Sequence, residues 1–441
     1  MDIIIVIIKK GSVFTMDYKN FEQKLIHTRR DFHTYPEAGW LEFRTCSIIA
    51  QRLEALGWVV KTGLDVIDPA SVMGRPSEEI IASNITRAIS QGANPEWITR
   101  LNGYTGLTAE LDTGLPGPVV ALRFDMDCVE VQEDNSPSHR PKHEGFSSVN
   151  TGLCHSCGHD AHMAIGLGVA EVLMSERDNL KGKVRLIFQP GEEGCRGAYA
   201  MTQKGVVDDA DYFLAMHIGM GVPSGVFALN TLGYLATTKI DADFTGVPAH
   251  AAASPHKGRN ALLAACSAAL GLHGIAPHSD GTMRINVGKL NAGSGRNVIA
   301  DHASMRIETR GETQDIADYV YSRAVEVLKG SAMMYGVDVN ITKAGEGTTA
   351  EGSPELVKLA GEAVRGLGIF ERVDDVMHAG ASEDATWFMR RVQSHGGMAT
   401  YLGLGSNITA PHHNGKFDID EGAIINGVMA LTAITERLMS S

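Results

Sequence analysis

The sequence predicts an α/β protein in which a central, mostly parallel sheet is flanked by helices and a smaller domain is inserted into the larger one. A chain of 441 residues exceeds what one hydrophobic core usually serves, so two domains are expected. Helix and strand patterns alternate between about 104 and 217, which is typical of a parallel sheet. From about 233 to 343 the order becomes βαββαβ, the pattern of a ferredoxin-like unit.

The larger domain is expected at 16–232 and 344–441. Residues 42–57 carry apolar side chains at helical spacing and end in a glycine, which predicts a helix. Residues from about 63 to 103 hold three prolines between short helical pieces, so we expect an insertion on the domain surface. The other expected elements are a β-hairpin around a Gly/Pro turn at 104–127, helices at 161–174, 197–205, 354–368 and 421–439, and strands at 183–189, 211–217 and 398–405.

The inserted domain is expected at 233–343. The expected order is strand 237–246, helix 259–273, strand 282–290, strand 303–310, helix 316–336 and strand 337–342.

The first ten residues, MDIIIVIIKK, contain six consecutive apolar residues with the lysines after them. A signal peptide places its charges first and has a longer apolar stretch, and a membrane helix is longer still. We therefore expect an extra strand or a disordered extension. Because a helix pattern starts at Met16, residues 1–15 are expected to be dispensable.

Composition narrows the class of partner. The formal charge of −13, with 39 Lys+Arg scattered along the chain, argues against nucleic-acid binding, which needs a positive patch. A small-molecule partner fits better, and neither nucleic acid nor membrane is expected. Six cysteines are too sparse for a secreted disulfide scaffold, so we expect reduced thiols and a cytoplasmic protein.

Four stretches rich in metal-ligand residue types follow or end expected strands of the larger domain. They are CHSCGHDAH (154–162), which lies beyond the strand ending in RFDMD, QPGEEG (189–194), His217, and APHHNGKF (410–417). Binding sites of open α/β sheets form outside the carboxyl ends of strands. We therefore expect these loops to converge on one site.

The residue types in these stretches suit a metallohydrolase. Cys157 and His159 flank a glycine that lets the loop turn, so both side chains can point to one centre. Asp160 is a candidate for orienting the His159 ring. Glu192 and Glu193 are adjacent acids that point in different directions. One can bind a metal while its neighbour moves a proton, which is the division of labour that metal-assisted hydrolysis needs.

Other interpretations remain open for the individual groups. A Glu pair in a turn is usually solvated, and a lone histidine at a strand end is usually a core residue. Cys154 and Cys157 form a C-x-x-C pair, which also occurs in thiol-redox proteins and structural zinc sites. However, the chain has no second C-x-x-C to complete a zinc site, and the context is not that of a thioredoxin-like motif.

These stretches, together with TGVPAHAAASP (245–255), GSGRNVI (293–299) and GASEDATWF (380–388), resemble the metal-dependent amidohydrolases that include hippurate, N-acyl-amino-acid and auxin-conjugate hydrolases. The resemblance extends from about 18 to 439. The insertion near 63–103 and the opening HTRRDFHTYPEAGWLEFRT are similar to the p-aminobenzoyl-glutamate hydrolase subgroup.

The resemblance implies ligands for two divalent metal ions, manganese or zinc, with the Cys157 thiolate as a bridge. His413 is preferred over His412 because the family places its ligand four residues before a Phe, here Phe417. Glu192 is implied as general base and later as proton donor. Asp125 and Asp127 match an acidic pair beneath the metals, either as support or in direct contact. The full implied ligand set is Cys157, His159, Glu193, His217 and His413.

The inserted domain resembles the lid and dimerisation domain of that family. His250 matches a histidine that steadies the oxyanion in the site of a partner chain, although it is also interpretable as a loop histidine between alanines. Asn297 and Arg310 match residues that bind the substrate carboxylate, with Arg296 and Arg306 as nearby competitors.

The resemblance implies a dinuclear amidohydrolase that cleaves N-acyl or N-aroyl amino acids, with p-aminobenzoyl-glutamate as favoured substrate. The expected assembly is a homodimer through the lid domain or a heteromer with a homologous subunit. The alternative is a chain that is active only with a homologous partner.

Overall fold

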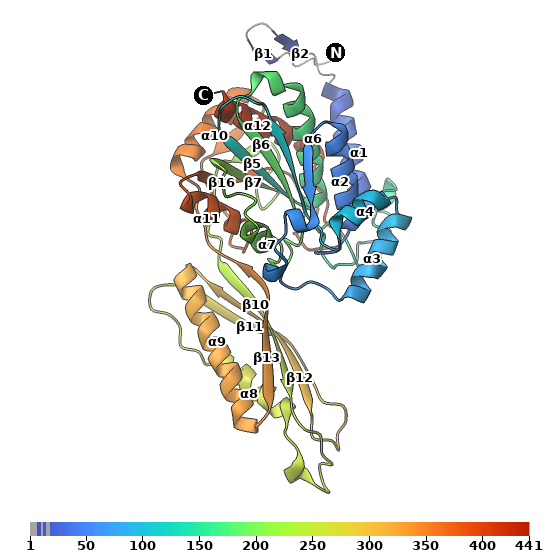
Figure 1. Cartoon of the computed structure of the whole chain (residues 1–441), viewed down its shortest axis with the longest axis vertical. Coiled ribbons are helices and arrows are strands. Elements are labelled where there is room, and N and C mark those ends of the chain that lie inside the picture. Colours follow the sequence, from blue (N-terminus) through green and yellow to red (C-terminus); the bar gives the residue numbers. More distant parts are fainter. Residues whose placement is uncertain (1–6, 10–11, 15–17, 441) are drawn as a thin grey trace.

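The chain folds into two parts, a larger α/β domain and an elongated inserted domain (Figure 1). A computed structural model describes residues 7–9, 12–14 and 18–440. The larger part contains an eight-stranded sheet between helices, and the inserted part contains a four-stranded sheet with helices on one side. The predicted fold class is therefore confirmed.

The large sheet is mixed, but its centre is parallel as expected. Its order is β14-β8-β16-β7-β5-β6-β4-β3, and the four strands β16, β7, β5 and β6 run parallel to one another. Antiparallel pairing occurs only toward the edges, among the described residues. The strands are β3 Val59–Thr62, β4 Leu107–Asp112, β5 Val119–Asp125, β6 Lys183–Gln189, β7 Tyr212–Ile218, β8 Val226–Ala228, β14 Arg372–Asp374 and β16 Met398–Leu404.

The hairpin predicted at 104–127 is wrong, although both of its strands exist. β6 lies between β4 and β5, antiparallel to the first and parallel to the second. The reason is burial: β5 is buried along nearly its whole length and pairs on both sides, with β6 and β7. Strands buried in this way occupy the middle of a sheet and take neighbours through crossover connections rather than through a tight turn.

Helices cover both faces of the large sheet, because its strands alternate apolar side chains between two cores. Leu122 of β5 faces one core and Ala121 faces the other. The first core is covered by α1 Tyr18–Thr34, α2 Phe43–Ala55, α6 His159–Ser175, α10 Pro354–Leu367 and α12 Gly422–Met439, and the second by α7 Ala198–Gln203 and α11 Thr386–Ser394.

The expected insertion near 63–103 adds two helices beside α2, α3 Glu78–Ser90 and α4 Pro95–Leu101. Ile81 and Trp97 from these helices are buried in the first core. The segment is therefore packed onto the domain rather than loosely attached. Other short elements of the large domain include α5 Arg140–His143 and the paired strands β9 Thr231–Leu232 and β15 Met377–His378.

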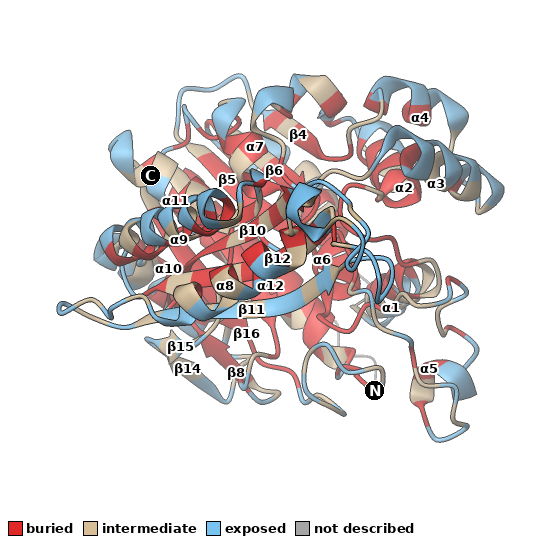
Figure 2. Ribbon diagram, turned by 90° about the horizontal axis from the view of Figure 1, so that it is seen from below, coloured by how far each residue is buried: buried red, intermediate tan, exposed pale blue. Residues whose placement is uncertain are grey.

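The inserted domain has the βαββαβ order predicted from the sequence. Its sheet is antiparallel with strand order β11-β12-β10-β13, and a core of its own lies between the sheet and the two helices. Figure 2 shows the exposed edge strand β11 in front of the mostly buried large sheet. The elements are β10 Ala236–Thr245, α8 Ala261–His273, β11 Met283–Ala292, β12 His302–Gly311, α9 Gln314–Tyr335 and β13 Asp338–Gly347.

Before α1, the short strands β1 Ile7–Lys9 and β2 Ser12–Phe14 pair with each other. That residues 1–15 are dispensable stays a prediction, because most of this segment lies outside the described residues. No helix within the described part of the chain combines the length and apolar character that a membrane crossing requires.

Candidate metal centre

The four ligand-bearing stretches meet at one edge of the large sheet. β16, β7, β5 and β6 are neighbours, and each stretch lies at or beyond the carboxyl end of one of them. The convergence expected from the sequence is therefore present. The loops surround a cavity of about 770 Å³ whose lining includes Cys157, Glu192, Glu193, His217 and His413.

The turn before α6 places the first two candidate ligands. Gly158 has φ +86°, and a Cβ atom there would lie 2.6 Å from the Ile218 side chain, so only glycine fits. The turn buries Cys157 and His159. Nδ1 of His159 lies 2.8 Å from the Asp127 backbone oxygen, which leaves Nε2 facing the site.

The candidate ligands form two groups that share one thiol. The donor atoms of Cys157, His159 and His217 lie within 4.8 Å of one another, and so do those of Cys157, Glu193 and His413. Nε2 of His159 is buried and makes no hydrogen bond, whereas buried polar groups are normally paired. Thiolate, imidazole and carboxylate are ligands that zinc and related metals accept. The residues therefore fit two neighbouring divalent ions.

The histidine pair in the loop after β16 is divided between two tasks. Nε2 of His412 lies 3.1 Å from the backbone nitrogen of Met220, whose N–H it accepts. Nε2 of His413 lies 3.3 Å from Glu193 Oε1. Hydrogen bonding to Cys157 and Glu193 raises the pKa of His413 to about 10. The geometry favours His413 over His412 as a ligand, as the sequence motif predicts.

Asp127 holds the acidic pair in place. Its carboxylate accepts the backbone N–H groups of Glu192 and Glu193 at 3.0 and 2.9 Å. Oε2 of Glu192 lies 3.9 Å from Nε2 of His159. Burial, together with Glu383 and Glu193, raises the pKa of Glu192 well above its usual range. Glu192 is therefore placed beside the ligand cluster in an environment that favours holding a proton.

Asp160 does not orient the His159 ring, so that part of the prediction is wrong. Its Oδ2 accepts hydrogen bonds from Arg29 and His33, both at 2.7 Å, and its Oδ1 accepts the Ala161 N–H. The cause is helix geometry, because adjacent residues on a helix point in different directions. The ring is held instead by the Asp127 carbonyl.

Sequence reasoning missed a buried chain of polar contacts beneath the ligands. Arg123 donates to Asp125 at 2.6 Å, Asp125 contacts Nδ1 of His162 at 2.5 Å, and Nε2 of His162 accepts the Ile218 N–H at 2.9 Å. These contacts fix the end of β7, where His217 lies. Asp125 thus acts as support, 3.8 Å from Nε2 of His159. Two charged residues within an otherwise apolar strand, Arg123 and Asp125 in VVALRFD, were the available signal.

The two cysteines of the C-x-x-C pair belong to different clusters. Cys154 lies with His33 and Glu133, whereas Cys157 lies with the candidate ligands. All six cysteines are free thiols in the structure. The pairing that a redox or structural-zinc motif requires has no geometric support here.

The structure separates the candidate residues of the inserted domain. Arg310, near the end of β12, lines the cavity. His250 and Asn297 lie together in the loops beyond the far ends of β10 and β11, where the Ala251 N–H donates to the Asn297 oxygen at 3.0 Å. β12 alone separates Arg310 from those loops by roughly 27 Å. Figure 1 shows these loops at the end of the domain remote from the large sheet. Asn297 and Arg310 therefore do not form one carboxylate site within a chain.

An α/β domain that gathers thiol, imidazole and carboxylate donors at its strand ends, beside a second carboxylate with a raised pKa, has the features of a metal-dependent hydrolase. A family model agrees: peptidase family M20/M25/M40 matches residues 121–437, and the chain belongs to this family. It is a metal-dependent amidohydrolase or peptidase.

Individual relatives are similar over almost the whole chain. The indole-3-acetyl-aspartic acid hydrolase of Enterobacter agglomerans is 50% identical over 92% of this chain and 94% of its own length. One of the subunits of p-aminobenzoyl-glutamate hydrolase from Escherichia coli K12 is 48% identical over the same shares. The crystal structure of an aminobenzoyl-glutamate utilization protein from Klebsiella pneumoniae has a TM-score of 0.83 and 42% identity, covering 95% of this chain and 96% of that one. The resemblance inferred from the motifs is confirmed.

Proposed function

We propose that the protein is a dinuclear amidohydrolase that cleaves the amide bond between an acyl or aroyl group and an acidic amino acid. The observation that carries the proposal is the pair of ligand groups sharing Cys157. One ion is assigned to Cys157, His159 and His217, and the other to Cys157, Glu193 and His413. Two bound divalent ions, manganese or zinc, supply charge that polarises the scissile carbonyl and activates water.

The residues of the chain divide the remaining work. Glu192 takes the proton from the attacking water and then returns it to the leaving amine, a role that suits a buried carboxylate with a raised pKa. Asp127 holds Glu192 in position by accepting its backbone N–H. Arg310 binds the substrate carboxylate with the planar donor geometry of guanidinium.

The names of two relatives support the proposed substrate class. One is named for indole-3-acetyl-aspartic acid and another for p-aminobenzoyl-glutamate, and both compounds join an aromatic acid to an acidic amino acid through an amide. We assign the same class here, with p-aminobenzoyl-glutamate as the favoured substrate.

The position of His250 supports an assembly of at least two chains. His250 and Asn297 lie at the remote end of the inserted domain, away from the cavity of their own chain. We propose that they complete the site of a partner chain, where His250 steadies the oxyanion and Asn297 contributes to carboxylate binding. The partner is a second copy in a homodimer or a homologous subunit in a heteromer.

A hydrolysis screen tests the function. Purified protein reconstituted with manganese, zinc or cobalt is expected to release p-aminobenzoate from p-aminobenzoyl-glutamate, with two metal ions per chain by elemental analysis. One tightly bound ion per chain, or none, would contradict the dinuclear centre. Activity that appears only after a homologous chain is added would replace the homodimer with the heteromer.

A further inference from the structure

Two cationic side chains of the inserted domain face the cavity. Lys239 on β10 and Arg310 on β12 both line it, together with Glu192 and Glu193. In the antiparallel register Arg310 pairs with Thr237, so Lys239 and Arg310 are diagonal neighbours on adjacent strands. Diagonal neighbours of this kind lie about 7–8 Å apart, within joint reach of one small ligand.

A single carboxylate lies between these cations. Glu308, directly opposite Lys239 in the register, forms an ion pair with Lys239 and accepts from Arg310 Nη2 at 3.0 Å. Glu308 does not belong to the cavity lining, whereas both cations do. The part of the lining that the inserted domain supplies therefore carries two cations with one acid behind them, whereas the acids of the lining, Glu192, Glu193 and Glu383, belong to the large domain.

The other candidate arginines are occupied elsewhere or remote. Arg306 does not line the cavity and lies 3.2 Å from Asp241 and 3.9 Å from Asp243. Arg296 lies beside Asn297 in the exposed loop after β11. Lys239 thus remains, next to Arg310, as the second cation available to a ligand in the cavity.

The surroundings of Lys239 distinguish it from an ordinary surface lysine. Its side chain is 28% exposed, and its charged neighbours are Glu308, Arg310, Glu192 and Glu193. Burial is the main cause that lowers its pKa. Desolvation of an ammonium group is unfavourable, and an anionic ligand arriving in the cavity would offset it.

We propose that Lys239 binds the side-chain carboxylate of the N-acyl amino acid while Arg310 binds the α-carboxylate. Lys239 is then the residue that selects glutamate and aspartate conjugates over conjugates of neutral amino acids. The proposal rests on the proposed amidohydrolase function and adds a specificity determinant to it. It predicts that a neutral isostere of the substrate, p-aminobenzoyl-glutamine, is a poor substrate.

The test compares kcat/KM for p-aminobenzoyl-glutamate and p-aminobenzoyl-glutamine. Lys239→Met is expected to lower the value for the glutamate conjugate by about 10- to 100-fold, mainly through KM, because a charge-assisted hydrogen bond is lost. The value for the glutamine conjugate is expected to change little. Lys239→Arg is expected to keep most of the preference, since the charge remains.

Lys343→Met is the matched control. Lys343 lies on β13, is 36% exposed and forms an ion pair with Glu346, but it does not line the cavity. Lys343→Met should leave the preference for the glutamate conjugate intact. If Lys239→Met lowers kcat/KM equally for both substrates, Lys239 acts only through the fold or through Glu308, and the proposal is overturned.

A binding measurement separates this inference from the proposed function. Thermal-shift titrations with free glutamate and glutamine are expected to show protection by glutamate that Lys239→Met abolishes and Lys343→Met retains. Equal hydrolysis of both conjugates by the wild type overturns the role of Lys239 and leaves the amidohydrolase function standing. Selective glutamate binding without any hydrolysis supports the role of Lys239 and overturns the function.

Discussion

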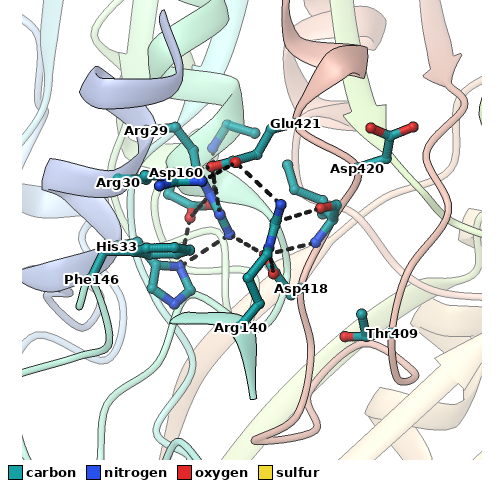
Figure 3. Close-up of polar contacts among 12 residues, drawn as sticks. Arg29, Arg30, His33, Arg140, Phe146, Asp160, Thr409, Asp418, Asp420 and Glu421 are labelled. Carbon is teal, nitrogen blue, oxygen red and sulfur yellow. Dashed lines mark hydrogen bonds and ion pairs between the residues drawn. The ribbon is translucent and has the colours of Figure 1, made fainter. Parts of the chain in front are cut away.

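Two buried polar clusters lie on either side of the first turn of α6, and they are built from similar residue types. One is the candidate metal centre around Cys157. The other, the Arg29 cluster, consists of Arg29, Arg30, His33, Glu133, His139, Arg140, Asp160, Asp418 and Glu421. Figure 3 shows that Arg29 lies at the middle of the second cluster.

The Arg29 cluster satisfies its charges internally. Arg29 is fully buried, and its three nitrogens lie 2.7 Å from Asp160, 2.9 Å from Asp418 and 3.2 Å from Glu421. His33 lies between two acids, 2.7 Å from Asp160 and 3.0 Å from Glu133. A buried charge network is tolerated when its members are paired in this way.

The candidate metal centre is arranged in the opposite way. It keeps a buried ring nitrogen of His159 without a partner and places the acids Glu192 and Glu193 side by side. Such an arrangement is unfavourable unless cations complete it. Whether the buried polar groups have partners, rather than which residue types are present, separates this ligand site from the structural network. The Arg29 cluster and the candidate metal centre are also linked along the chain, since Asp160 follows His159 and Asp418 belongs to the loop that carries His413.

The largest effect is expected from Glu192→Gln. The substitution keeps the shape of the side chain but removes the proton acceptor, so kcat should fall by about 10²- to 10⁴-fold. Metal content should remain at the wild-type level, because Glu193 is the assigned ligand. Steady-state kinetics and elemental analysis on the same preparation check both statements. Retained turnover would refute the role of Glu192 as base.

Arg29→Met tests the satisfied cluster. It leaves Asp160, Asp418 and Glu421 buried without their shared cation, so the free energy of unfolding should fall by about 3–5 kcal/mol. Arg391→Met is the control, because Arg391 forms an exposed pair with Asp208 and should cost less than about 1 kcal/mol. Urea unfolding of both variants gives the comparison. Equal losses of unfolding free energy in the two variants would mean that the buried Arg29 cluster contributes no more to stability than an exposed ion pair.

Cys157→Ser and Cys154→Ser test which thiol binds metal. Cys157→Ser should weaken metal binding by at least about 10- to 100-fold, the loss typical of disturbing even the outer shell of a metal site. Cys154→Ser should leave affinity unchanged, since Cys154 lies with His33 and Glu133. Competition with a chelating indicator measures both. Equal effects would restore the C-x-x-C pair as the functional unit.

The sequence predicts those features that depend on neighbouring residues. The strand ends, the glycine before His159 and the candidate ligands are local patterns, and the structure brings the ligands together. The predicted β4–β5 hairpin is wrong because strand order depends on β6, which lies far along the chain. Asp160 was misjudged because its partner, Arg29, is 131 residues away.

The separation of Asn297 from Arg310 could not be predicted from motifs either. Both residues occur in matching motifs only 13 positions apart in the sequence, but the intervening strand carries them to opposite ends of the inserted domain. Lys239 was missed for a related reason. A lysine within an alternating strand usually faces solvent, and only its pairing with Glu308 and its place in the cavity lining identify it.

The smallest expected effect concerns the acid sensitivity of the Arg29 cluster. Burial alone would raise the pKa values of Asp418 and Glu421, but neighbouring arginines hold both below their usual range. Their contribution to stability is therefore present above the unfolded-state pKa of about 4 and is lost as the pH falls through the folded-state values. Arg140→Met removes one of these arginines, which lies 2.5 Å from Asp418.

Arg140→Met should therefore cost about 1 kcal/mol at pH 7 and should flatten the loss of stability as the pH falls below about 4. Urea unfolding of chelator-treated protein at several pH values measures this slope without a contribution from metal release. A wild-type slope in Arg140→Met would show that Arg140 does not lower these pKa values. If the slope flattens in Arg140→Met but stays at the wild-type value in Cys157→Ser, the acid sensitivity lies in the Arg29 cluster, because the carboxylates that titrate there are the ones that arginine holds ionised.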